Sequence, residues 1–339
     1  MKRNIFRIAL VICLFLSSFL FSGAVFAQDE ALPSPGITPD SPFYFLDKLG
    51  KDIGMFFAFG NEAKAKKALK YAEERLSEVR VMMEKNRIRE MERAANDYDG
   101  YMAMVNERLE NAGISDNITA TVALAAARHL AVLDNLTDRV PQQAAAAIAH
   151  AKEVSINGQV NALRALAKDK PENAIDIASQ SVENRMERAR IRISGNIISA
   201  NVTGEALDYA ARISALEDEI TALAEQKGID TTAILQRLAQ STSHRLETLS
   251  GVYDKAPESA RQGIENAIEN SVKKYQRALD KLKEKNASGN VTDEETVMNR
   301  IQKEIRERLQ INASNSSSVN QTREQQETRD QDRNRAHNP

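Results

Sequence analysis

The sequence P-Q-Q-A-A-A-A-I-A-H-A at 141–151 is repeated, with changes, as P-E-S-A-R-Q-G-I-E-N-A at 257–267. In both copies the proline is followed by Ala, Ile and Ala at helical spacing. Proline suits the first turn of a helix, where its missing N–H group is not needed. Residues spaced by three and four form one apolar stripe along a helix. Each copy therefore predicts a core helix of a helical bundle.

The duplication extends beyond these two helices. Gly113-Ile114-Ser115 matches Gly228-Ile229-Asp230, a helix end followed by a new cap. The chain therefore predicts an all-α fold of two tandem helical units, residues 61–168 and 169–285. Long helices with coiled-coil-like seams are expected, with a weak break near Asn86 and a loop over 195–204. The seam residues include Leu69, Ala72, Leu76, Val79 and Met83 in the first unit, and Ile213, Leu216 and Ile220 in the second.

Residues 1–27 have the features of a secretory signal peptide. Basic residues precede an apolar run over 8–21, and Val25-Phe26-Ala27 offers a cleavage site. The alternative is an uncleaved membrane anchor over 8–21. Export to the cell surface or the extracellular space is expected in the first case. The one cysteine, Cys13, lies inside this run, so the cleaved chain has no thiol for catalysis or metal binding.

An extended linker over 28–40 leads to an aromatic-rich segment over 41–60. Asp40, Ser41 and Pro42 predict the start of a helix there. The chain has ten phenylalanines; five lie in residues 1–27 and the other five in this segment. We expect the segment to dock onto the bundle as a plug, or else to bind a partner or a membrane surface. The candidate docking residues are Phe43, Tyr44, Phe45, Phe56, Phe57 and Phe59.

The C-terminal part is predicted to lie outside the bundle. Residues 286–311 form a polar linker and a short helix, which Thr292 and Glu295 begin as a capping box. Residues 312–339 are polar without an apolar pattern and predict a disordered tail.

Eight Asn-x-Ser/Thr sequons are candidate N-glycosylation sites. Most of them fall at a predicted helix start, loop, linker or tail, where an acceptor is accessible, and Asn135 falls inside a helix. The alternative is that these residue types favour caps and turns in any case. The asparagines are Asn117, Asn135, Asn201, Asn286, Asn290, Asn312, Asn315 and Asn320.

No motif of an enzyme or a cofactor site is present. His129 and His244 occupy similar places in the two copies, but no further ligand spacing accompanies them. A seam histidine is therefore favoured over a metal ligand, and neither a metal nor a cofactor is predicted. The charged run Glu73, Glu74, Arg75, Glu78 and Arg80 predicts solvated ion pairs rather than paired catalytic carboxylates.

Two segments resemble a family of unknown function found in exported bacterial and archaeal proteins. They are T-P-D-S-P-F-Y-F-L-D-K-L (Thr38–Leu49) and A-E-E-R-L-S-E-V-R (Ala72–Arg80). The R-H-L-x-V-L segment at Arg128 and the helix at Pro141 look like its C-terminal half, so the resemblance covers 38–167. The second copy lacks the aromatic S-P-x-Y opening. The resemblance implies export and an all-helical fold, and it carries no activity.

These observations favour an exported, non-catalytic interaction protein that binds another protein or an envelope polymer. The net charge of −2 gives no electrostatic reason to expect nucleic-acid binding. One alternative is an envelope sensor, a bundle that binds a ligand or metal and is tethered by an uncleaved N-terminal helix. The other is a peripheral membrane protein held by the phenylalanine-rich helix. The oligomeric state is left open.

Overall fold

The computed structural model describes residues 32–110, 114–195, 200–253, 255–285 and 303, and this part of the chain is all-helical without a β-strand. The predicted all-α class is therefore confirmed. A 3-10 turn, η1, lies at Gln142–Ala144. The helices in chain order are α2 (Tyr44–Phe56), α3 (Asn61–Glu84), α4 (Ile88–Glu110), α5 (Asp116–Thr137), α6 (Ala145–Ala167), α7 (Pro171–Ser194), α8 (Ala200–Gln226), α9 (Thr232–Tyr253) and α10 (Glu258–Glu284).

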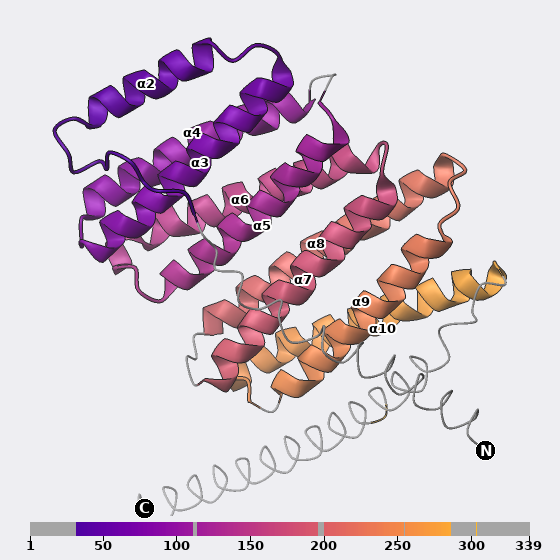
Figure 1. Cartoon of the computed structure of the whole chain (residues 1–339). Helices are drawn as coiled ribbons and strands as arrows, with labels where there is room; N and C mark the ends of the chain where they lie inside the picture. The colour runs from indigo at the N-terminus through magenta and orange to yellow at the C-terminus, as the bar shows by residue number, and fades with distance from the viewer. Residues whose placement is uncertain (1–31, 111–113, 196–199, 254, 286–302, 304–339) are drawn as a thin grey trace, which may run out of the picture.

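After α2, the helices form four hairpins stacked in one row: α3–α4, α5–α6, α7–α8 and α9–α10. The first helix of each hairpin contacts the first helix of the next, and the second helices do the same. Figure 1 shows α2 at one end of the row and the α9–α10 hairpin at the other. The two predicted units are thus consecutive pairs of hairpins that share one hydrophobic core from α3 to α10.

The core follows the helical spacing of small and branched residues. Alanines on α3 let the neighbouring helices approach closely, and larger residues fill the seam between them. The predicted seam residues are buried, including Leu69, Ala72, Leu76, Val79 and Met83 on α3 and Ile213, Leu216 and Ile220 on α8.

Two predicted helix ends are confirmed by their backbone conformation. Asn86 has φ 54° and Gly228 has φ 70°, the left-handed region that ends many helices. The Arg87 N–H group donates to the Met82 carbonyl oxygen at 2.8 Å. Asparagine tolerates this conformation better than other side chains, so α3 ends there without glycine or proline.

Other predicted boundaries were wrong by one to five residues. Pro141 (ψ 148°) and Pro257 (ψ 146°) are extended, so they precede their helices rather than occupying the first turn. The two prolines share this extended conformation, as expected if the two units arose by duplication. α8 begins at Ala200, so the loop predicted over 195–204 is shorter than expected. α2 begins at Tyr44 and not at Pro42.

Several predicted segments lie outside the described residues. These are the signal peptide over 1–27, the short helix after 292, except for residue 303, and the tail over 312–339. Among the helices that are described, none combines the length and apolar character needed to cross a bilayer.

Candidate docking surface on helix α2

Helix α2 is attached to the first hairpin through its polar side. Tyr44, the first residue of α2, and Lys51, near its middle, are buried. The Lys67 amine of α3 donates to the Gly54 carbonyl oxygen at 2.8 Å. A Cβ atom at Gly54 would overlap the Tyr71 hydroxyl, so glycine permits the close approach of α2 to α3.

Arg75 of α3 is the centre of the buried contact under α2. Its guanidinium is fully buried, lies 5.1 Å from the Tyr44 ring centroid and donates to the Tyr44 hydroxyl. The same guanidinium pairs with Asp47 at 2.6 Å and with Glu78 at 2.7 Å. α2 is therefore fixed by hydrogen bonds and ion pairs to a buried charge, rather than by an apolar seam.

Two lysines of α2 complete this cluster. Lys51 lies 2.5 Å from Asp47 and 3.0 Å from Glu74, and Lys48 lies 2.9 Å from Asp97 of α4. With Glu78, the cluster holds three cationic groups and four carboxyl groups. Burial raises the pKa of Glu78 to about 8, because a charged carboxylate loses its hydration there. The raised pKa favours the neutral form of Glu78, and the other charges of the cluster balance without it.

This cluster corrects the prediction that the charged run of α3 is solvated. Arg75 and Glu78 are both fully buried, while Glu73, Glu74 and Arg80 are half-buried. The physical reason is that α2 covers this side of α3 with polar groups of its own. A charged residue on α3 is then satisfied by the protein instead of by water.

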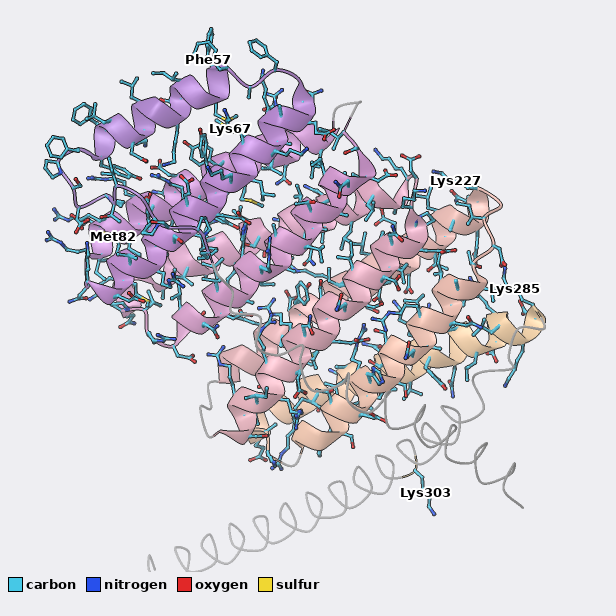
Figure 2. All side chains as sticks on the ribbon, in the orientation of Figure 1. Phe57, Lys67, Met82, Lys227, Lys285 and Lys303 are labelled. Atoms are coloured by element: carbon cyan, nitrogen blue, oxygen red, sulfur yellow. The ribbon has the colours of Figure 1, made fainter. Side chains whose placement is uncertain are left out.

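The outer side of α2 is apolar and faces away from the protein. Phe45, Leu49, Ile53 and Phe56 follow one another at helical spacing, and all four are exposed. Figure 2 shows Phe57, just after α2, pointing away from the hairpins. The five phenylalanines of the segment have exposed fractions of 59–82%. They are Phe43, Phe45, Phe56, Phe57 and Phe59.

The prediction of a buried aromatic plug was therefore wrong for these five phenylalanines. Tyr44 alone among the candidate docking residues points inward, with an exposed fraction of 7%. At about 150–250 Å² for a phenylalanine, the five rings expose roughly 700 Å². Leu46, Leu49 and Ile53 add to this area. The largest patch of a typical monomer is about 300–600 Å², so this surface is larger than a soluble monomer needs.

The three sequon asparagines within the described helices lie apart in the sequence, two on α5 and one on α8. Asn117, in the first turn of α5, and Asn135, near its end, are exposed. Asn201 lies in the first turn of α8 and not in the predicted loop. The other sequons are outside the described residues: Asn286, Asn290, Asn312, Asn315 and Asn320.

The two histidines considered as metal ligands lie in different environments. His129 is buried, with Nδ1 3.1 Å from the Tyr98 hydroxyl, whereas His244 is exposed beside an open hollow of about 210 Å³. Burial lowers the pKa of His129, which favours the neutral ring. Within the described residues, no three His, Cys, Asp or Glu side chains are grouped as metal ligands.

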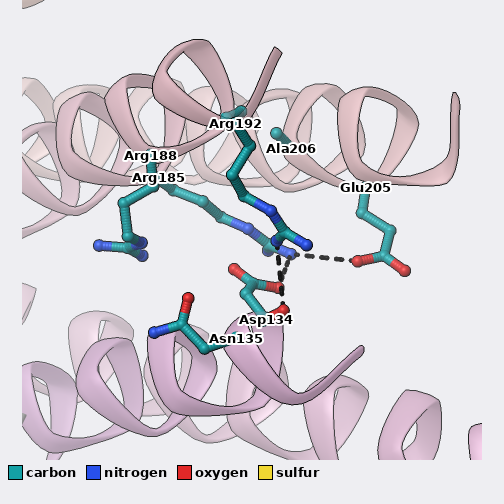
Figure 3. A pocket seen from close by; sticks show the side chains of 8 residues that line it. Asp134, Asn135, Arg185, Arg188, Arg192, Glu205 and Ala206 are labelled. Atoms are coloured by element: carbon teal, nitrogen blue, oxygen red, sulfur yellow. Dashed lines mark hydrogen bonds and ion pairs between the residues drawn. The ribbon is translucent and has the colours of Figure 1, made fainter. Parts of the chain in front are cut away.

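A second buried ionic cluster joins the middle hairpins (Figure 3). Arg185 of α7 pairs with Asp134 of α5 at 3.0 Å, and Lys152 of α6 lies 2.5 Å from Glu205 of α8. The cavity beside it measures about 20 Å³. That volume holds about one water molecule, so the cluster joins helices and leaves no room for an organic ligand.

Sequence reasoning missed both clusters, although a signal was present. An arginine lies slightly past the middle of the first helix of every hairpin: Arg75, Arg128, Arg185 and Arg245. Three of the four are buried against carboxylates of neighbouring helices. The recurrence of an arginine at the same place in each hairpin could have indicated that these arginines have a structural role.

Residues 36–143 match the family model of a domain of unknown function, DUF5667. The match takes in α2 to α5 and ends in η1, so the aromatic opening is part of it. The resemblance expected to continue to residue 167 is not covered by this match. No curated protein matched the sequence.

One solved structure similar to the chain is described as a circular tandem repeat protein with novel repeat topology and enhanced subunit contact surfaces. The TM-score is 0.55 at 12% identity, and the alignment covers 77% of this chain and 55% of that chain. The chain thus spans about half the length of that protein. The likeness supports an all-helical tandem-repeat fold and nothing about activity.

Proposed function

We propose that this protein is an exported, non-catalytic interaction module that attaches to the cell envelope through the outer face of α2. The observation that carries the proposal is the orientation of α2. Its polar side is buried against charged residues, and its apolar side is left exposed. Covering roughly 700 Å² of aromatic surface would contribute on the order of 15 kcal/mol to the free energy of binding, before the entropic costs of association are subtracted.

The alternative proposal, a bundle that senses a ligand or metal, has less support. The cavity at the ionic cluster between the middle hairpins has room for about one water molecule. His129 and His244 also lie in separate environments. A hydrated envelope polymer likewise suits this apolar surface less well than an apolar partner does.

The proposal is tested by removing the exposed rings in the native host. The variant carries Phe56→Ser, Phe57→Ser and Phe59→Ser. Its matched control carries Met104→Ser, Leu124→Ser and Ile191→Ser, which also replace exposed large apolar residues. We expect the wild type and the control in the envelope fraction, and the α2 variant released from it with an unchanged Tm.

Two results would contradict the proposal. One is an α2 variant that stays in the envelope fraction as the wild type does. The other is a large fall in Tm, which would mean that the rings are buried in the folded protein. The intact mass of the same samples reports export, because cleavage gives a chain beginning at Gln28. Added sugar mass would establish use of the sequons.

A further inference from the structure

We propose that the outer face of α2, together with the lysines that begin α3, binds the surface of an anionic lipid membrane. This inference rests on the proposed function, since it identifies the partner of the same apolar face. Three features of the described residues support it: the shape of the apolar face, its small number of polar groups and the charge beside it.

The shape suits the interface of a bilayer. α2 has 13 residues and is therefore about 20 Å long, and it lies outermost at one end of the row of hairpins. Phe45, Leu49, Ile53 and Phe56 form a continuous ridge along its outer side. A helix lying in the membrane plane buries such a ridge at the boundary between headgroups and acyl chains, while its polar side stays outside. The polar side of α2 is already satisfied by the first hairpin.

The outer face offers few polar side chains for a protein partner to recognise. Its exposed residues from Phe45 to Phe57 are phenylalanine, leucine, isoleucine and glycine, together with two charged residues, Lys48 and Asp52. Lys48 pairs with Asp97 of α4, which leaves Asp52 as the one acidic side chain beside the ridge. Protein interfaces typically carry about one hydrogen bond per 100–200 Å². The acyl region of a membrane needs none, so the composition favours lipid over protein.

The charge beside the face is complementary to acidic headgroups. Residues 43–70 contain six lysines and three acidic residues, although the whole chain has a net charge of −2. Lys48 and Lys51 are paired in the cluster under α2, so the lysines left to face a membrane are those that begin α3. Lys67 contacts α2 through the Gly54 carbonyl oxygen, and Lys66 and Lys70 are exposed on the same end of α3. These lysines follow directly after Phe57 and Phe59. Lysines near a membrane surface add attraction to acidic phospholipids, and this attraction weakens with salt.

The test uses the absence of tryptophan from the chain. Phe57→Trp, in the full chain, introduces one indole on the proposed contact face. The control Ile191→Trp places it at another exposed apolar position, on α7. Vesicles of phosphatidylcholine, with or without an equal part of phosphatidylglycerol, are then added. Matching vesicles brominated in the acyl chains report insertion by quenching. The local readout separates α2 from any binding by residues 8–21.

We expect Phe57→Trp emission to shift to shorter wavelength and to be quenched by brominated vesicles that contain phosphatidylglycerol. Ile191→Trp emission should change little. Adding Lys66→Glu and Lys70→Glu to Phe57→Trp should weaken the response at least tenfold, and added salt should weaken it as well. No quenching, equal quenching at both positions, or an equal response to vesicles without phosphatidylglycerol would overturn the inference. If vesicles fail but the serine variant is still released from the envelope, the docking face stands and its partner is a protein.

Discussion

Replacing Arg75 by methionine should release α2 from the first hairpin. The guanidinium contacts Tyr44 and Asp47 of α2 and Glu78 of α3, and the Tyr44 hydroxyl also donates to Glu78 at 3.1 Å. Methionine keeps an unbranched apolar chain in the site but removes the positive charge and every hydrogen bond that the guanidinium makes. The cluster would then hold more negative than positive charge under α2.

The magnitude follows from burial. Removing one partner of a buried ion pair costs about 3–5 kcal/mol. We expect about 3 kcal/mol, the lower end, because Lys51 still lies 2.5 Å from Asp47 and a protonated Glu78 needs no counter-charge. This free energy corresponds to roughly a 150-fold change in an equilibrium constant. The loss should be local, since each hairpin of a stacked repeat contacts only its neighbours.

Hydrogen exchange followed by mass spectrometry measures the local loss of stability directly, peptide by peptide. Amides of α2 (Tyr44–Phe56) should exchange about a hundredfold faster in Arg75→Met, while amides of α9 and α10 should not change. Arg128→Met is the matched control, because Arg128 is the corresponding arginine of the second hairpin. Its side chain is 61% exposed and 3.4 Å from Glu73, so about 0–1 kcal/mol is expected. Equal effects of the two variants, or less than a tenfold change in α2, would refute the reasoning.

Three further predictions concern the folded state. The folded-state pKa of Glu78, about 8, exceeds its unfolded value near 4.5, so the stability it contributes is complete below pH 4.5 and is lost as pH rises to about 8. In urea unfolding across this range, the free energy of unfolding of the wild type should fall by up to ~1.4 kcal/mol per pH unit. That of Glu78→Gln should not show this fall. Gly54→Ala should push α2 off the Tyr71 hydroxyl and increase proteolysis between α2 and α3; unchanged cleavage would count against the close contact. Leu133→Ala, at a fully buried position, should cost about 2–5 kcal/mol in urea unfolding, against about 0.5 or less for the exposed Leu124→Ala; similar losses would place the core elsewhere.

The helices and their core could be predicted because helical spacing is a local property. Leu69, Leu76 and Val79 share one side of any helix that contains them, and a side this apolar is buried in a bundle. The end at Asn86 could also be predicted, since few other residues accept its conformation. What spacing does not report is how many helices make one repeat. The pairs Arg128–Glu73 and Arg164–Glu219 each join residues 55 apart, which is one hairpin. The sequence similarity was visible only across two hairpins.

The orientation of α2 could not be predicted, and the reason is physical. Periodicity separates the two sides of a helix, but it does not say which side faces the protein. The usual assumption, that the apolar side faces inward, follows from burial in water. It fails here because the first hairpin offers α2 a buried guanidinium and carboxyl groups, which only the polar side of α2 can satisfy. If Tyr44 and Asp47 turned outward, Arg75 would be left buried without these partners, at a cost of several kcal/mol. The phenylalanines are therefore exposed because Arg75 fixes the opposite side, and the same charge that holds α2 in place presents its apolar side for binding.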